Sequence, residues 1–172
     1  MQLTKGFEQA ACIIALLATQ KRDVPLSSQI IHERIKGSQT YLQKIMRKLV
    51  VAGLITSVSG NSGGFSLAKD PKEITFLQIV NATEGDIKTY PDLGFLDLVF
   101  KDFLPISHEA THVIGELFQE ADKRWCEYLS EKTVHDIILE TFGNRQVKLV
   151  DWNDPDVTKK QEMAELLKNI KY

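Results

Sequence analysis

Apolar residues in the first part of the chain recur every three or four positions, a spacing that predicts amphipathic helices. Three segments show this pattern, and each follows a residue that often caps a helix: Thr4, Ser27 and Ser38. The first predicted helix ends at 21–25, and a tight turn at 36–37 separates the second helix from the third. Two short helices joined by such a turn are typical of a helix-turn-helix.

The third predicted helix has two contrasting faces. Its apolar stripe, which we expect to be buried, consists of Tyr41, Leu42, Ile45, Met46 and Leu49. The opposite face is polar and basic, as in a helix that enters the major groove of DNA. We expect base edges or nearby phosphates to be contacted by Ser38, Gln39, Thr40, Gln43 and Lys44, and the DNA backbone by Arg47 and Lys48.

Two short predicted strands, at 54–58 and 65–68, flank a glycine-rich turn and indicate a β-hairpin. Directly after a helix-turn-helix, a hairpin is typical of a wing, which here would comprise Ser59, Gly60, Asn61, Ser62, Gly63 and Gly64. Its glycines predict positive φ angles and a close approach to a phosphate backbone. A nucleotide-binding loop is disfavoured because no Lys-Ser/Thr follows and the next element is a strand. A fourth helix is predicted from a capping box at Thr75 and Gln78 to a stop at Gly85.

The charge distribution is uneven, although the 172 residues carry a net charge of only −2. Residues 1–89 hold eleven Lys and Arg against seven Asp and Glu, which gives +4, and residues 90–172 hold ten against sixteen, which gives −6. Between Arg34 and Lys69, both included, there are six basic residues and no acidic one. Such a basic block favours a polyanionic partner such as double-stranded DNA, although a solvated surface gives the same pattern.

Composition narrows the class of protein further. A hydrophobic share of 43% is sufficient for one or two small folded domains. No run approaches the ~18 consecutive apolar residues of a membrane span, and the start of the chain lacks the pattern of a secretory signal. Two cysteines, Cys12 and Cys126, are too few for a disulfide framework. We therefore expect a reduced, cytoplasmic protein with no membrane partner.

Several short motifs, taken in order, resemble a known family. They are Leu3-Thr4-Lys5, Tyr41-Leu42-x-Lys44-Ile45-x-x-Lys48-Leu49, Ala52-Gly53-Leu54, Gly63-Gly64-Phe65-x-Leu67-Ala68, Ile74-Thr75, Ile79-Val80 and Glu84-Gly85. The set is similar to the Rrf2 family of bacterial winged-helix transcription regulators, which includes IscR, NsrR and CymR. The resemblance implies a mainly α fold with a small β-hairpin wing, a third helix in the major groove, and a long C-terminal helix that builds a dimer.

The second half of the chain contains a stripe that suits such a dimerisation helix. Apolar residues recur at helical spacing over about six turns, at Ile106, Ala110, Val113, Ile114, Leu117, Phe118, Ala121, Trp125 and Tyr128. A broad apolar face of this length needs a partner surface. An ordinary core helix would satisfy this need, but the resemblance favours a homodimer.

The sequence departs from the family where some members hold iron. Cluster-binding members have three cysteines between the fourth helix and the dimer helix, whereas residues 87–105 contain none. Leu, Val and Phe cannot replace thiolate ligands, so we expect no iron–sulfur cluster and no other cofactor. We expect this apolar segment to fill the core, with a hydrophobic effector pocket as the alternative. Ser59 stands where members often carry a minor-groove arginine, so the family's operator cannot be transferred.

Other candidate chemistry is weaker. His108 and His112 lie one helical turn apart and could ligate a metal, but an exposed helix surface explains them better. Cys12 lies beside the apolar stripe of the first helix, and we expect it to be a small buried residue. No nucleophile, base and orienting acid can be assembled from the sequence, so we expect neither catalytic residues nor an enzyme.

The predicted organisation is a winged helix-turn-helix DNA-binding domain over 1–86, an apolar linker or effector region over 87–105, dimerisation helices over 106–143, and a C-terminal extension with a terminal helix over 144–172. The dimer surface would comprise Ile106, Val113, Ile114, Leu117, Phe118, Ala121, Trp125 and Tyr128. We expect a homodimeric repressor. Two alternatives remain open: a regulator that responds to a small molecule bound at 87–105, and a protein-interaction adaptor that has lost operator binding.

Overall fold

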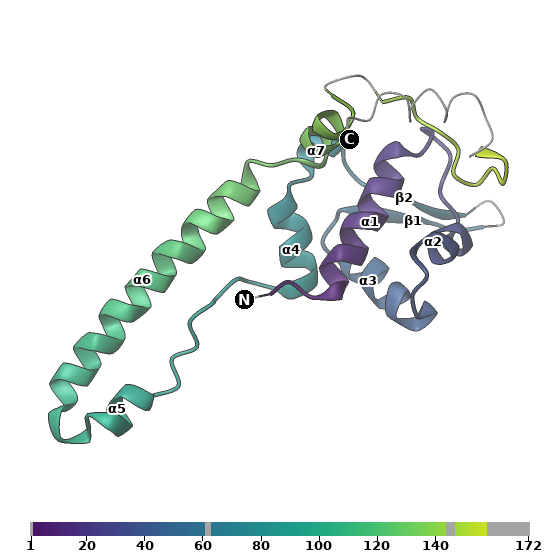
Figure 1. The fold of residues 1–172 in the computed structure, drawn as a ribbon. Coiled ribbons are helices and arrows are strands. Elements are labelled where there is room, and N and C mark those ends of the chain that lie inside the picture. Colours follow the sequence, from purple (N-terminus) through teal and green to yellow (C-terminus); the bar gives the residue numbers. More distant parts are fainter. Residues whose placement is uncertain (1, 61–62, 144–146, 158–172) are drawn as a thin grey trace.

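The chain forms a helical body from which a long helical arm projects (Figure 1). The structure is a computed structural model, and it describes residues 2–60, 63–143 and 147–157. The elements of the body are α1 (Lys5–Thr19), α2 (Ser28–Ile35), α3 (Gln39–Val51), β1 (Ile55–Val58), β2 (Gly64–Leu67), the 3-10 turn η1 (Pro71–Glu73), α4 (Phe76–Glu84) and α7 (Val134–Thr141). The arm consists of α5 (Phe95–Val99), the 3-10 turn η2 (Lys101–Phe103) and α6 (Leu104–Ser130).

Local capping signals set where most helices of the body begin. The Thr4 hydroxyl accepts a hydrogen bond from the Gly6 amide at 3.1 Å, and the Ser27 hydroxyl accepts one from the Ile30 amide at 3.2 Å. At α4, the Thr75 hydroxyl and the Gln78 side chain form the predicted reciprocal capping box. Ser38 takes the N-cap position of α3, but its side chain makes no capping hydrogen bond.

The turn between α2 and α3 differs in detail from the expectation. Lys36, not Gly37, adopts the left-handed conformation, with a φ of 50°. Gly37 is required for another reason, because a Cβ there would lie 2.8 Å from Nε2 of Gln9 on α1. The side chain of Gln9 thus packs directly against the turn of the helix-turn-helix.

The core of the body lies between α1, α2, α3, α4 and the hairpin. Apolar side chains that are at most 1% exposed include Ile13, Ile14, Leu26, Ile31, Leu42, Leu49, Leu54, Ile55, Ile74, Ile79 and Val80. The predicted apolar stripe of α3 is buried except for Tyr41, which is 41% exposed. Tyr41 was therefore wrongly assigned to the core; its ring lies at the edge of the body, where its hydroxyl reaches Gly6 at the start of α1.

The hairpin pairs β1 with β2 in antiparallel register, from Ile55 opposite Leu67 to Val58 opposite Gly64. The outer edge of β2 also pairs with Leu26, since the amides of Leu26 and Phe65 donate to each other's carbonyls at 2.9 and 2.8 Å. A Cβ on Gly64 would lie 2.2 Å from the Leu26 carbonyl oxygen. The predicted role of the wing glycines is therefore wrong for Gly64, which lets two backbones of this chain approach each other.

The arm carries most of the large apolar side chains that the body does not bury. Its two α-helices are joined by a hydrogen bond from the buried Ser107 hydroxyl of α6 to the Asp97 carboxylate of α5, at 2.6 Å. The expectation that 87–105 fills the core is wrong, because this segment runs outward along α6 and away from the body (Figure 1). Large side chains of this segment that are at least 43% exposed are Leu93, Phe95, Leu98, Val99, Phe100, Phe103 and Leu104.

Residues 147–157, which we call the C-terminal strap, return to the body. Val150 accepts from the Lys21 amide at 2.8 Å and donates to the Thr19 carbonyl at 3.0 Å. The Asn153 side chain accepts from the Ser27 amide at 3.0 Å and donates to the Pro25 carbonyl at 3.1 Å. The strap therefore fixes the loop between α1 and α2. The terminal helix predicted beyond the strap lies outside the described residues.

Candidate DNA-binding interface

The predicted DNA-contacting residues of α3 share one exposed face. All of the following are exposed: Ser38, Gln39, Thr40, Gln43, Lys44, Arg47 and Lys48. Their neighbours on the opposite face are buried, with Leu42, Ile45 and Leu49 at most 3% exposed. Burial of one face fixes how the helix is turned, so the polar face points away from the body. The structure thus brings the candidate residues of this helix together on a convex surface.

The electrostatics of this face suit a polyanion. Among the described residues, neither Lys44 nor Arg47 has a carboxylate within ion-pair distance. Their charges are therefore not neutralised within the described part of the chain. An unpaired cation can bind a DNA phosphate, while the exposed amides and hydroxyls beside it can bind base edges.

Lys48 differs from the other two cations of α3. Its Nζ donates a short hydrogen bond to the main-chain carbonyl of Thr83, in the last turn of α4. A cation at the C-terminal end of a helix is favourable because carbonyl oxygens there lack helical partners. An ammonium group has three N–H donors, so donors remain for a phosphate. The hydrogen bond holds Lys48 in place and ties α3 to α4.

The wing is described in part. Ser59 and Gly60 are exposed, and Gly60 has a φ of 112°, which supports the predicted turn. Asn61 and Ser62 lie outside the described residues. Gly63 and Gly64 are half-buried: the Gly63 amide donates to the Gly60 carbonyl within the turn, and Gly64 lies against Leu26 of the body. The exposed part of the wing next to this turn also includes Ser57 and Val58 of β1.

Sequence reasoning missed two residues at the start of α2. Ser28 and Gln29 line a hollow of about 350 Å³ that Gln39 and Gln43 of α3 also line. Both residues are exposed in the first turn of α2, where backbone amides without helical partners attract anions. The sequence indicates that a helix starts at Ser27-Ser28. Only the packing of α2 against α3 shows that Ser28 and Gln29 share a surface with the residues of α3.

The predicted dimer surface is exposed along the arm. Ile106, Val113, Leu117 and Tyr128 are between 55% and 67% exposed. Three further members, Phe118, Ala121 and Trp125, lie on the same helix, where Phe118 stacks on Tyr90 with ring centroids 5.3 Å apart. Ile114 is half-buried and helps to line an apolar hollow with Ile106 and Val113. This arm leaves an extended apolar surface without a partner in the described chain.

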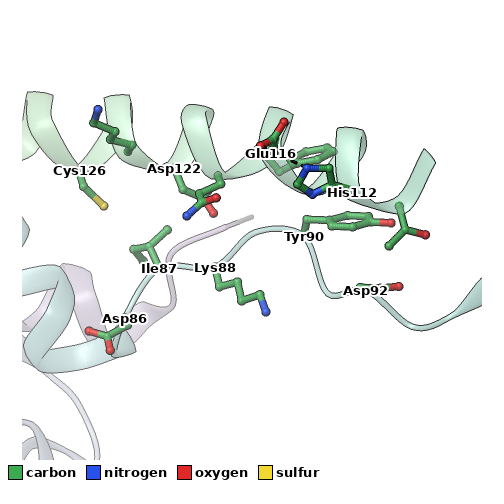
Figure 2. Close-up of a pocket in the computed structure, with 14 residues that line it drawn as sticks. Asp86, Ile87, Lys88, Tyr90, Asp92, His112, Glu116, Asp122 and Cys126 are labelled. Atoms are coloured by element: carbon green, nitrogen blue, oxygen red, sulfur yellow. Dashed lines mark ion pairs between the residues drawn. The ribbon is translucent and has the colours of Figure 1, made fainter. Parts of the chain in front are cut away.

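A pocket of about 780 Å³ separates α6 from the segment that follows α4 (Figure 2). Asp122 of α6 anchors the segment by accepting hydrogen bonds from the Thr89 hydroxyl, at 2.7 Å, and the Thr89 amide, at 3.0 Å. These two hydrogen bonds lower the pKa of Asp122 below its ordinary value. Lys88, Tyr90 and His112 also line the pocket, so its surface mixes polar and aromatic groups.

The residues of this pocket do not fit an iron–sulfur cluster. Cys126 is the single thiol among its lining residues. Burial, followed by the charge of Asp122, raises the pKa of Cys126, which favours the neutral thiol over the thiolate that binds iron. Within the described residues, no three His, Cys, Asp or Glu side chains are grouped as a metal site requires.

The remaining chemical candidates are separated in space. His108 lies 3.7 Å from Asp97, whereas His112 lies 3.5 Å from Glu116, so each histidine has its own carboxylate. Cys12 is exposed, which contradicts the expectation of a buried residue, because it lies on the side of α1 that faces a cavity and not the core. No helix among the described residues is long and apolar enough to cross a membrane.

An exposed basic face on α3, a hairpin wing and an apolar arm together define a winged helix-turn-helix transcription regulator. The chain belongs to the Rrf2 family, since the family model described as an iron-dependent transcriptional regulator matches residues 3–140. The relatives are named as transcriptional regulators, a class of DNA-binding proteins without enzymatic activity. The predicted fold class and family are both confirmed.

Individual relatives and solved structures agree with this assignment. YwgB of Bacillus subtilis (strain 168), a candidate helix-turn-helix transcriptional regulator, is 32% identical over 80% of this chain and 85% of its own. NsrR of Shouchella clausii is 31% identical over 81% of this chain and 89% of its own. Two solved structures share the fold. CymR, the global cysteine regulator of B. subtilis, is 21% identical, with a TM-score of 0.60 over 82% of this chain and 98% of the CymR chain. IscR of T. potens is 22% identical, with a TM-score of 0.61 over 86% of this chain and 93% of the IscR chain.

Proposed function

We propose that this chain is a homodimeric, sequence-specific repressor that acts in the cytoplasm without an iron–sulfur cluster. The observation that carries the proposal is the polar face of α3, which is exposed along its whole length while its apolar face, apart from Tyr41, is buried. A helix presented in this way fits the major groove of DNA. A repressor of this kind prevents transcription by occupying its operator.

Individual residues take different parts in the proposed complex. Gln39, Thr40 and Gln43 offer amides and hydroxyls to base edges, and Ser38 has a hydroxyl that the helix does not use as a cap. Lys44, Arg47 and Lys48 bind phosphates, as do the exposed backbone amides of Ser59 and Gly60 in the wing. Ser28 and Gln29 add contacts from the start of α2.

The homodimer is supported by the apolar surface of the arm. Charged residues line the sides of α6, but Ile106, Val113, Leu117 and Tyr128 form an exposed apolar stripe along it. A second copy would bury this stripe against its own, as a two-fold interface requires. The exposed aromatic and aliphatic residues of α5 and η2 would extend the same interface. Two DNA-binding bodies at opposite ends of such a dimer would then bind two half-sites.

DNA binding is tested by selecting genomic fragments with the purified protein and measuring the affinity of the selected sequence by fluorescence anisotropy. Gln43→Ala should weaken operator binding by roughly 1–3 kcal/mol per half-site and leave binding to random DNA unchanged. Ser130→Ala, at an exposed position at the end of α6, serves as the control. If the wild-type protein ignored all DNA at low salt, the protein-interaction adaptor would replace the repressor.

A second candidate function is favoured by the pocket along α6. Its volume of about 780 Å³ is sufficient for a small molecule, and it connects the end of α4 to the dimer arm. A regulator that responds to a small molecule bound there would be stabilised against heat by that molecule. Thermal melting against a metabolite collection tests this candidate, and a Gly115→Trp variant, which fills the pocket, should abolish any stabilisation.

A further inference from the structure

The C-terminal strap holds both ends of α2. The Asn153 side chain accepts a hydrogen bond from the Ser27 amide at 3.0 Å and donates one to the Pro25 carbonyl at 3.1 Å. Ser27 is the N-cap of α2. The ring centroid of the preceding residue, Trp152, lies 4.5 Å from the guanidinium carbon of Arg34, in the last turn of α2. Two consecutive residues of the strap therefore contact opposite ends of a helix about 12 Å long.

The strap can hold α2 because its own residues are fixed to α1. Gln20, which is 6% exposed at the end of α1, donates to the Asp151 carboxylate at 3.1 Å and accepts from the Trp152 amide at 2.9 Å. The Asp151 carboxylate also accepts from the amide and from the side chain of Asn153, each at 3.0 Å. The Trp152 indole donates to the Thr19 hydroxyl at 3.0 Å. This network of hydrogen bonds orients the Asn153 side chain and sets the position of α2 relative to α1.

Helix α2 depends on such support because it has few anchors of its own. It has eight residues, of which Ile31 alone is buried. A helix of about two turns is marginal without tertiary contacts. Ile30 and Ile35 are partly buried and pack on the core, which holds one side of the helix. The strap adds the contacts that fix the two ends.

The end of α2 that Asn153 holds belongs to the proposed DNA-binding surface. Ser28 directly follows Ser27 and lines the hollow of about 350 Å³ together with Gln39 and Gln43 of α3. Hydrogen bonds form only over a narrow range of distances. Ser28 and Gln43 can therefore bind the same DNA site only if α2 and α3 keep one spacing.

We propose that Asn153 and Trp152 are positioning residues for DNA binding, which act on operator affinity through α2. The strap holds Ser28 at the spacing from α3 that the operator requires, so α2 does not have to be ordered when DNA binds. This role rests on the proposed repressor function. The strap follows residues 3–140, the part of the chain that the family model matches, so it supplements the shared winged helix-turn-helix.

Hydrogen exchange of the full chain without DNA tests whether the strap holds α2. In Asn153→Ala the Ser27 amide loses its acceptor, and we expect the amides of 27–35 to exchange at least about tenfold faster than in the wild type. The amides of α4 should keep their wild-type rates. Asn81→Ala, at an exposed position on α4, is the control and should leave the exchange of α2 unchanged. Wild-type exchange of α2 in Asn153→Ala would overturn the proposal.

Operator affinity tests the consequence for DNA binding. Asn153→Ala should weaken operator binding about tenfold, because α2 then has to be ordered on binding. The slope of log K against log salt should stay at its wild-type value, since the change removes no cation. Unchanged operator affinity would overturn the positioning role.

A double-mutant cycle separates positioning from a general loss of stability. Ser28→Ala should weaken operator binding about fivefold in the wild type, but by less than about twofold in Asn153→Ala, where Ser28 is no longer held in place. Lys44→Ala, which lies on α3 and outside the hollow, should weaken binding by the same factor in both backgrounds. A Ser28→Ala effect of equal size in both backgrounds would show that Asn153 has only a general structural role.

Trp152→Leu carries the same cycle if Asn153→Ala does not fold. The variant keeps an apolar side chain against the core but loses both the ring beside Arg34 and the donor to Thr19. It should weaken operator binding about threefold and should likewise reduce the effect of Ser28→Ala. Wild-type affinity of Trp152→Leu would exclude Trp152 from the positioning role. Failure of the repressor function itself is distinguishable, because the wild-type protein would then ignore DNA while hydrogen exchange still reported the hold on α2.

Discussion

The ammonium group of Lys48, on α3, donates a hydrogen bond to the main-chain carbonyl of Thr83, near the end of α4. This contact joins the helix that we expect in the major groove to the helix that leads into the arm. Gly85 ends α4 with a φ of 83°, and the chain then enters the segment that lines the pocket along α6. Lys48 therefore contributes to the position of α3 as well as to its charge.

Replacing Lys48 and Lys44 one at a time separates these two contributions. Each lysine that neutralises a phosphate releases counterions, so either change to alanine should reduce the slope of log K against log salt by about 0.9 per phosphate, or about 1.8 in a symmetric dimer. Lys48→Ala should in addition lower the Tm by about 2–4 °C, because a hydrogen bond of about 1 kcal/mol is lost. Lys44 makes no such hydrogen bond among the described residues, so Lys44→Ala should leave the Tm unchanged.

Anisotropy titrations at several salt concentrations and calorimetric melting supply the two measurements. A Lys48→Ala variant with wild-type salt dependence and a lowered Tm would show that Lys48 has a structural role alone. A Lys44→Ala variant with wild-type salt dependence would contradict the placement of α3 on DNA.

Charging the apolar stripe of the arm tests the homodimer. Leu117 is 67% exposed in the single chain, so Leu117→Glu should leave the fold of the chain intact. In a dimer the same carboxylate would be buried without a partner, which is strongly unfavourable. We expect monomers in light scattering, or loss of soluble protein. Gln119→Glu adds an equal charge on the pocket side of α6 and should remain dimeric.

A dimeric Leu117→Glu variant with wild-type melting would place the interface elsewhere. The exposed apolar residues of α5 would then be the next surface to test, for example with Phe95→Glu, since Phe95 is 65% exposed.

Metal content provides an independent test of the cofactor assignment. The pocket along α6 has one thiol, Cys126, and its raised pKa disfavours thiolate. Protein purified without oxygen should therefore be colourless and free of iron. Stoichiometric iron in elemental analysis, or absorbance near ~400 nm that survives desalting, would contradict this assignment.

The sequence predicts the DNA-binding body well because its signals are local. The capping residues Thr4, Ser27 and Thr75 and the alternation of buried and exposed positions on α3 depend on neighbours within one or two helical turns. Such signals need no knowledge of distant contacts. The hydrogen bond from Lys48 to Thr83 joins residues 35 positions apart, and nothing in the local pattern indicates it.

Two expectations failed, and the contacts of the strap went unpredicted, for the same physical reason. The hydrophobicity of 87–105 predicts that the segment is buried, but it does not show whether the same chain or a second chain buries it. In the single chain the segment is exposed on the arm. Cys12 lies at the border of an apolar helix stripe, where the position of α7 decides its exposure. The strap is held by backbone pairing of Val150 with Thr19 and Lys21, residues far away in the sequence, and such a contact leaves no periodic pattern.

Acid should release the strap. Burial opposes ionisation of Asp151, but hydrogen bonds from the Gln20 side chain and from Asn153 lower its pKa below the ordinary value of 3.8. A carboxyl group whose pKa is lower in the folded chain than in the unfolded chain stabilises the folded state at pH values above the unfolded pKa. This stabilisation is lost as the pH falls through the folded pKa. The strap should therefore be firmly held at neutral pH and should detach below about pH 4.

Fluorescence of Trp152 reports this step, provided that Trp125 is replaced by phenylalanine so that a single tryptophan remains. We expect an emission shift on acidification, as the indole loses its contacts with Thr19 and Arg34, before the far-ultraviolet circular dichroism of the body changes. Asp151→Asn keeps the shape of the side chain but removes the titrating charge, so its emission should be independent of pH between about 3 and 6. An acid transition that persisted in Asp151→Asn would assign the pH dependence to another group.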